Sequence, residues 1–148
     1  MAKTESEARV GELDQRQLVD ALVRTSFVTM AVLTKIGAEH DLSLTQLRVL
    51  AILMDRRANM SALADYLGLD KSTISGLVDR AEKRGLLQRV ANPTDGRGVD
   101  VVLTDEGMTL AERGATLIGQ NLALLTDALS RAESQRLTTL LERILEHI

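Results

Sequence analysis

The chain has 148 residues, of which 45% are apolar and 26% charged, with a net charge of −3; this is the composition of one globular domain with room for extensions. It contains no cysteine, one phenylalanine, one tyrosine and no tryptophan, which excludes disulfides, thiol nucleophiles, cysteine-based oxidation sensing and zinc knuckles, together with an aromatic platform for single-stranded nucleic acid. The N-terminal residues form no signal-peptide core and no apolar run approaches the length of a membrane span, so we expect a cytoplasmic protein without a membrane partner.

The net charge is unevenly distributed along the chain. Residues 45–101 carry a net charge of +2 and the remainder a net charge of −5. A mildly basic centre between acidic arms favours an anionic partner for the central segment. Chance variation among solvated faces would give the same pattern, so the distribution alone leaves both interpretations open.

Two helices are predicted in the first third of the chain. After about ten polar residues that we expect to be disordered, apolar positions at three- and four-residue steps predict one long helix over residues 13–39. This helix is apolar on more than one face near residues 30–33, which is typical of a helix that packs against its own core and against a second subunit. Ser43, followed three residues later by Gln46, forms a capping-box pattern that predicts the start of the next helix.

A helix-turn-helix is predicted in the basic segment. A short helix follows Asn59 or Ser61 and ends at Gly68, and a second helix starts at Asp70 and ends at Gly85. The second helix has one apolar stripe, which consists of Ile74, Leu77, Val78 and Ala81. Its other face carries Lys71, Ser72, Thr73, Ser75, Gly76, Asp79, Arg80 and Lys83. Helix-turn-helix proteins insert the N-terminal end of this helix into the major groove, and an ordinary solvated face is the alternative.

A β-hairpin follows the second of these helices. Residues 86–90 and 99–103 are β-type runs, and the loop ANPTDGRG between them is rich in turn residues. We expect a half-buried return strand in which Val99, Val101 and Leu103 alternate with the outward-facing Asp100 and Val102.

Two more helices complete the chain. Thr104 caps a helix that we expect to run from about residue 105 to residue 129, and Ser130 with Glu133 forms a capping box that opens a last helix to the C-terminus. The predicted fold is therefore mainly α with a small β-hairpin. A winged helix-turn-helix (residues 41–104) lies between an N-terminal tail and dimerisation helix (residues 1–40) and C-terminal dimerisation helices (residues 105–148). A monomer could hardly cover such apolar arms, so we expect a two-fold homodimer with its recognition helices about one DNA turn apart.

The order of these elements resembles the MarR family of winged-helix transcriptional regulators. The stretches that carry the resemblance are LSLTQLRVLAIL, LADYLGLDKSTISGLVDRAEKRGLLQR and DGRGVDVVLTDEG, and the resemblance covers roughly residues 13–148. It implies a homodimeric regulator of transcription, usually a repressor, that binds a pseudo-palindromic operator in double-stranded DNA. In many members a small aromatic or phenolic anion releases the DNA by binding between the DNA-binding lobe and the dimer helices.

The resemblance also implies which residues contact DNA. The predicted major-groove residues are Ser72, Thr73, Ser75 and Arg80, and Lys71 is also a predicted DNA contact. Apart from the resemblance, the charges of Arg80, Lys83, Arg84 and Arg89 make them candidate phosphate contacts, any one of which could merely be solvated. Arg97 would reach the minor groove from the wing, held by Asp95. Gly76 is a departure, since relatives usually carry a larger and often basic residue there. The glycine lowers helix stability by about 1 kcal/mol relative to alanine and shifts specificity toward Arg97 and groove shape.

The position of Arg97 has a physical rationale of its own. An arginine at a loop tip suits a narrow, electronegative minor groove. A carboxylate two residues away, here Asp95, could hold the guanidinium by a charge-assisted hydrogen bond. The alternative is an exposed ion pair that contributes little.

Other candidate sites are less specific. An effector pocket could be lined by Phe27, Met30, Leu33 and Met54, although core packing explains the same residues. We expect His40 to be a surface histidine rather than a metal ligand, and Phe27 and Tyr66 to belong to the core. No metal or cofactor is expected.

Two other classes of function remain as alternatives. A winged-helix module for protein interaction, without sequence-specific DNA binding, is favoured by Gly76 and by the acidic net charge. An enzyme is not expected, because the sequence has no paired catalytic carboxylates, nucleophile elbow or phosphate-binding glycine loop. We therefore predict no catalytic residues.

Overall fold

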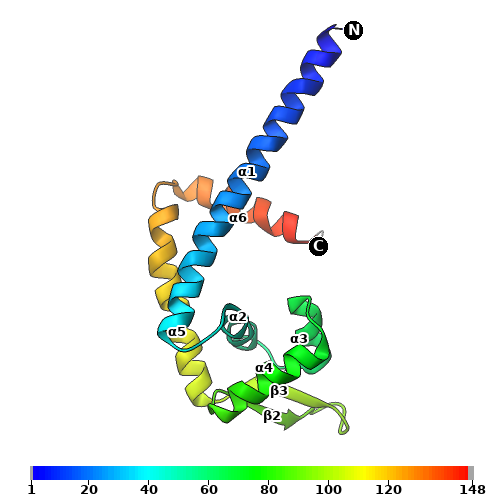
Figure 1. Ribbon diagram of the computed structural model, residues 1–148, viewed down its shortest axis with the longest axis vertical. Coiled ribbons are helices and arrows are strands. Elements are labelled where there is room, and N and C mark those ends of the chain that lie inside the picture. The colour runs from blue at the N-terminus through cyan, green and yellow to red at the C-terminus, as the bar shows by residue number, and fades with distance from the viewer. Residues whose placement is uncertain (1, 147–148) are drawn as a thin grey trace.

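The computed structural model describes the backbone of residues 2–146 and the side chains of residues 13–146. Within these limits a compact lobe lies below a long N-terminal helix, one C-terminal helix returns beside that helix, and the last helix crosses it in this view (Figure 1). The elements in chain order are α1 (Ala2–Glu39), α2 (Leu44–Leu53), β1 (Ala58–Asn59), α3 (Met60–Leu67), α4 (Lys71–Lys83), β2 (Leu87–Ala91), β3 (Val99–Leu103), α5 (Asp105–Thr126) and α6 (Arg131–Leu145). The prediction of a mainly α protein with a small β element is confirmed.

The first helix is longer than predicted. It begins at Ala2 rather than near Leu13, so the expected disordered tail is helical in the structure. Ala, Lys, Glu and Arg dominate these first residues, and all four are good helix formers. The polar composition of these residues therefore does not predict disorder, because the same residues favour a helix. At the other end of the chain, α6 ends at Leu145 and the last two residues lie outside the described part.

Five of the helices start at the cap residues that the sequence predicts. Ser43 and Ser130 each form a complete capping box, with Gln46 and Glu133 respectively. The side chains of Asn59, Asp70 and Thr104 accept the first free backbone N–H groups of α3, α4 and α5, so Asn59 rather than Ser61 is the cap of α3. Helix α3 ends at Gly68, whose φ of 63° is left-handed and suits the tight turn into α4.

The sheet has three strands rather than the predicted two. Strand β3 lies in the centre, with the order β1-β3-β2, and both pairings are antiparallel. Two residues, Ala58 and Asn59, form β1 and pair with Val101 and Asp100. A two-residue strand shows no periodicity, which is why the sequence did not indicate it.

The burial of β3 also differs from the predicted alternation. Val99 is exposed, whereas Asp100 is only 3% exposed and Val101 is fully buried. Val99 pairs with Ala91 at the outer end of the hairpin, beyond the core. The enclosed Asp100 carboxylate accepts hydrogen bonds from the side-chain amide of Asn92 across the hairpin, which satisfy its oxygens.

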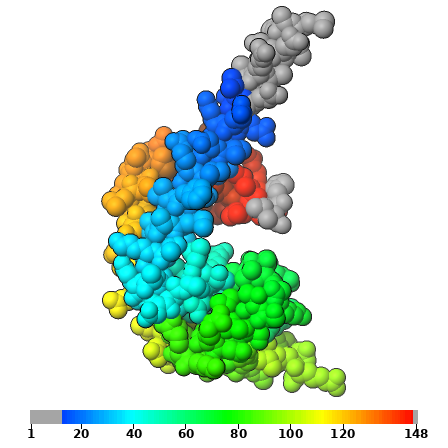
Figure 2. Space-filling view, viewed as in Figure 1, coloured from blue at the N-terminus to red at the C-terminus, as the bar shows by residue number. Residues whose placement is uncertain are grey.

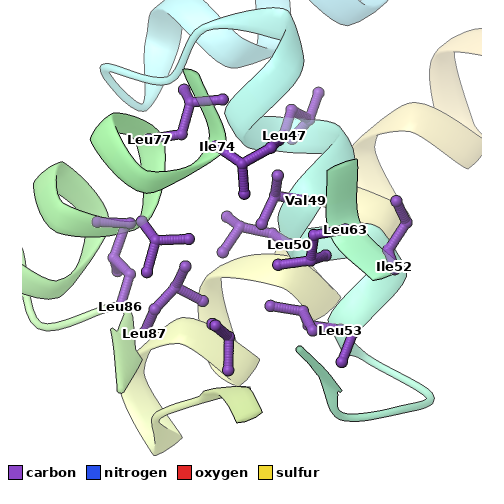
Figure 3. Close-up of a cluster of buried hydrophobic side chains, with 14 of the residues drawn as sticks. Leu47, Val49, Leu50, Ile52, Leu53, Leu63, Ile74, Leu77, Leu86 and Leu87 are labelled. Carbon is purple, nitrogen blue, oxygen red and sulfur yellow. The ribbon is translucent and has the colours of Figure 1, made fainter. Parts of the chain in front are cut away.

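One hydrophobic core holds the lobe together. Buried side chains from α2, α3, α4, both sides of the wing and α5 converge on it (Figure 3). Leu63, Ile74, Val78 and Val101 are completely enclosed, and full burial of such a side chain contributes about 1.5–3 kcal/mol. The predicted apolar stripe of α4 therefore faces this core, and the opposite face of the helix points outward.

The long helices leave a large apolar surface uncovered. Helix α1 packs against α2 and α5, and Ile36 near its end is buried, but α6 has no buried residue. Phe27 is 70% exposed and Tyr66 is 54% exposed, so the prediction that both belong to the core is wrong for this chain alone. The exposed apolar residues of the arms are Leu13, Leu18, Val19, Leu22, Val23, Phe27, Val28 and Met30 on α1, Leu124 and Leu125 on α5, and Leu137, Leu140, Leu141, Ile144 and Leu145 on α6.

By length and composition, Leu13–Glu39 could cross a membrane, which differs from the prediction that no apolar run approaches the length of a membrane span. The segment includes Arg24 paired with Asp20 at 2.9 Å, and its C-terminal end packs into the lobe. An apolar helix of this kind can equally be covered by other helices.

Candidate DNA-binding surface

The N-terminus of α4 is organised by its cap residue. Asp70 accepts hydrogen bonds from the Ser72 hydroxyl at 2.5 Å, the Thr73 backbone N–H at 2.9 Å and the Thr73 hydroxyl at 2.7 Å. These bonds, that of Ser72 foremost, hold the pKa of Asp70 well below its ordinary value. Both hydroxyls that are predicted to contact DNA are thus oriented by a carboxylate, and each must leave Asp70 before it can donate to another acceptor.

The outward face of α4 carries cations without partners. Lys71 and Arg80 are exposed and Ser75 is half-buried. Within residues 13–146, the side chains of Lys71, Arg80 and Lys83 take part in no hydrogen bond or ion pair. Their charges are therefore available to an external anion.

Arg84 has a different role from the predicted phosphate contact. Its guanidinium donates to the backbone carbonyl oxygens of Asp41 at 2.5 Å and His40 at 2.9 Å. Asp41 has a φ of 54°, the one positive φ of a non-glycine residue in the described chain. Arg84 thereby joins the end of α4 to the turn between α1 and α2.

Arg89 is also committed within the chain. Its guanidinium pairs with Asp79 at 2.7 Å and with Glu82, and its backbone N–H donates to Glu82 Oε1 at 2.9 Å. The hydrogen bond with Asp79 is the main cause of its raised pKa. Two carboxylates of α4 therefore neutralise this cation and link β2 to α4. Arg89 was predicted to contact DNA, but unlike Lys71, Arg80 and Arg97 it is already paired within the chain.

The wing tip is organised by Asn92, which the sequence reading overlooked. Its Oδ1 accepts from the Thr94 backbone N–H, the Thr94 hydroxyl and the Asp95 backbone N–H, at 2.8–2.9 Å. Its Nδ2 donates to both carboxylate oxygens of Asp100, at 3.1 and 3.2 Å. The signal was present, because an asparagine that starts a turn commonly accepts backbone N–H groups two or three residues later.

Asp95 holds Arg97 differently from the prediction. Its Oδ1 accepts the backbone N–H of Arg97 at 3.1 Å, rather than a hydrogen bond from the guanidinium. Across the described side chains, the guanidinium of Arg97 has no ion-pair or hydrogen-bond partner. The wing projects beyond the body of the lobe in Figure 2, so an exposed, unpaired cation lies at its tip.

The four predicted effector residues do not form one enclosed site. Phe27 and Met30 are exposed on α1, whereas Leu33 and Met54 pack against the core. The prediction of a surface histidine at position 40 is wrong in part, because His40 is half-buried and its Nε2 is enclosed without a hydrogen-bond partner in the described structure. No cluster of three metal-ligating side chains occurs among the described residues.

Comparison with known proteins gives a consistent result. Residues 40–98 match a model of the MarR family. The multiple antibiotic resistance protein MarR of Salmonella typhimurium is 34% identical over 107 residues, which are 71% of this chain and 74% of that protein. A mutant MarR from E. coli, solved in complex with operator DNA, is 27% identical, with 87% of this chain and 94% of that chain covered and a TM-score of 0.69. CouR from Rhodococcus jostii, solved with bound p-coumaroyl-CoA, is 25% identical, with 84% and 88% covered and a TM-score of 0.75.

Proposed function

Because the chain belongs to the MarR family and is a DNA-binding transcriptional regulator, we propose that it acts as a homodimeric repressor on a pseudo-palindromic operator. The observation that carries this proposal is the placement of its unpaired cations. Lys71 and Arg80 on α4 and Arg97 on the wing tip are exposed and unpaired in the described structure, whereas Arg84 and Arg89 bond to other groups of the same chain. Free cations on a helix and on a flanking wing suit the two grooves and the backbone of a duplex.

We propose that α4 enters the major groove. After Lys71, its outward-facing residues near the N-terminus are short, so the backbone can approach the bases closely. The proposed contacts are Lys71, Ser72, Thr73, Ser75 and Arg80. Arg97 enters the adjacent minor groove, with its backbone held by Asp95.

The homodimer is supported by the uncovered arms. The exposed apolar residues of α6 lie at positions 137, 140, 141, 144 and 145, a spacing that puts them on one helix face. Burial of apolar surface contributes about 25 cal/mol per Å², so leaving these arms in water is costly. A second copy related by a two-fold axis would cover the same surface on both chains.

An effector is the least specific part of the proposal. CouR was solved with bound p-coumaroyl-CoA, and we propose that a small aromatic or phenolic compound binds the present protein and weakens its hold on DNA. Phe27 and Met30 lie on the uncovered face of α1, so a site built from them with Leu33 and Met54 would require the partner subunit. A regulator of this kind acts in the cytoplasm.

A gel-shift titration on the DNA upstream of the protein's own gene tests the proposal. We expect a specific retarded band at low salt. The band should weaken as the salt concentration rises, because protein binding releases counterions from the phosphates and this release is less favourable at high salt. Sedimentation of the free protein should give a dimer. A dimer that retards no specific DNA at low salt would favour the alternative module for protein interaction.

A further inference from the structure

Gly76, Gly107 and Gly114 lie inside helices, and they differ in how much space each has for a side chain. At Gly107 an added Cβ would lie 1.9 Å from the carbonyl oxygen of Leu86, so only glycine fits. At Gly114 a Cβ would meet the Leu47 side chain at 3.6 Å, an ordinary packing contact. At Gly76, on α4, the nearest atom is Nη1 of Arg80 at 3.4 Å, the mobile end of a long side chain. Neither backbone nor core therefore requires glycine at position 76.

Glycine at this position nevertheless has a cost. It lies inside a 13-residue helix with an ordinary helical backbone, where glycine is among the poorest residues. The feature that it makes possible is the seat of Arg80. Residues four apart are neighbours on a helix, and long side chains lean toward the N-terminus. The guanidinium of Arg80 accordingly lies over the bare backbone of Gly76, one turn closer to the end of α4 that enters the groove.

The guanidinium of Arg80 lies over Gly76 without a bond to any other part of the chain that the structure describes. Within the described chain Arg80 has no ion-pair or hydrogen-bond partner, in contrast to Arg84 and Arg89. Its donors are thus free, and a guanidinium matches the O6 and N7 acceptors of guanine in the major groove. The Cβ of an alanine at position 76 would already lie 3.4 Å from Nη1, and a larger side chain would occupy the same space and displace the guanidinium along the helix.

We propose that Gly76 is a specificity-determining position, because it seats the Arg80 guanidinium over the middle of α4, where it reads a guanine edge in the operator. Arg80 is on this basis a base contact rather than a phosphate contact. The inference rests on the proposed docking of α4 in the major groove. On this proposal Gly76 promotes base readout by Arg80, whereas the sequence alone indicated that the glycine weakens base readout from α4.

A double-mutant cycle on the footprinted operator tests the coupling between the two residues. Arg80→Ala should weaken binding roughly 5- to 150-fold, the range of one good base contact. Gly76→Leu should give a similar loss, and the double variant should be no weaker than Arg80→Ala alone. Gly76→Ala, whose Cβ would lie 3.4 Å from Nη1 of Arg80, should give a smaller loss than Gly76→Leu. Gly114→Ala is the matched control, because it replaces a helix glycine whose Cβ would make an ordinary contact with Leu47, and it should bind the operator as wild type does. If the losses from Gly76→Leu and Arg80→Ala multiply instead, the seat is not the reason for the glycine.

Operator variants separate a base contact from a phosphate contact. Replacing each G·C pair in turn should reveal one position at which wild type discriminates and at which Arg80→Ala and Gly76→Leu do not. Uniform loss on all sequences, with the salt slope reduced by about 1, would overturn the assignment of Arg80 as a base reader. The gel shift of the wild-type protein tests whether it binds the operator at all. A failure of the proposed function would therefore appear in wild type, whereas a failure of the Gly76 proposal would appear only in the variants. Circular dichroism of each variant confirms that the helices are intact.

Discussion

Asn92→Ala is the most informative change at the wing. The amide connects the two halves of the hairpin, because Oδ1 holds the turn at Thr94 and Asp95 while Nδ2 reaches Asp100 on the other strand. Alanine removes all these bonds and keeps the backbone. It also leaves the carboxylate of Asp100, which is only 3% exposed, without the side-chain donor that it has in the structure.

The expected loss follows from these two groups of bonds. A buried acceptor deprived of its donor costs about 1–3 kcal/mol. The bonds to Oδ1 are exposed, so water replaces them and their loss adds only about 1 kcal/mol. The free energy of unfolding should therefore fall by about 2–4 kcal/mol, which for a chain of this size lowers Tm by roughly 4–16 °C.

Thermal and urea unfolding measure this loss, with Thr94→Ala as the matched control. Thr94 contributes one exposed hydroxyl bond to Asn92, so its removal should cost no more than about 1 kcal/mol. Operator affinity should also fall in Asn92→Ala, because the turn that presents Arg97 loosens. An Asn92→Ala protein with wild-type Tm and wild-type affinity would refute the role of this amide.

Four further outcomes are expected. Arg97→Ala should weaken operator binding by about 1–3 kcal/mol with an unchanged dimer by sedimentation; unchanged affinity would contradict the minor-groove role. Arg89→Ala should lower the free energy of unfolding by about 1–2 kcal/mol and leave the salt slope of binding unchanged, since its charge is already neutralised; a slope reduced by about 1 would identify a phosphate contact instead. Removal of the chain from Ser130 should give monomers or insoluble protein, and a well-behaved truncated dimer would argue against α6 as a dimer element. The pKa of Asp70 is lowered on folding, so its stabilisation is complete above its unfolded value of about 4 and is lost as the pH falls below it; Asp70→Asn should unfold with a weaker dependence on pH in this acidic range, and an unaltered dependence would contradict the capping role.

Features that depend on a few neighbouring residues were predictable from the sequence. The caps at Ser43, Asp70, Thr104 and Ser130 act on N–H groups within three residues, so their chemistry is visible in the chain itself. The apolar stripe of α4 follows from helical spacing alone. The order of the elements followed from the same local patterns, and the resemblance to a known family added the expected DNA contacts.

Features that join distant segments were not predictable. Arg84 and the carbonyl of Asp41 are 43 residues apart in the chain, and the sequence showed only a basic residue near a helix end. The burial of Asp100 depends on an amide on the opposite strand. Likewise, Phe27 is exposed in a single copy of the chain, and only a surface from outside that copy, such as the proposed second subunit, would cover it.

The bonds from Arg84 to the turn after α1 have a mechanical consequence. They tie the turn between the arm and the lobe to the end of α4, so we expect them to limit how far the two lobes of the proposed dimer can move apart. Inserting one base pair between the half-sites would move them apart by about 3.4 Å and rotate one about the duplex axis. The bonds of Arg84 would have to break to follow this change, so we expect the proposed dimer to discriminate the spacing of the half-sites as well as their bases.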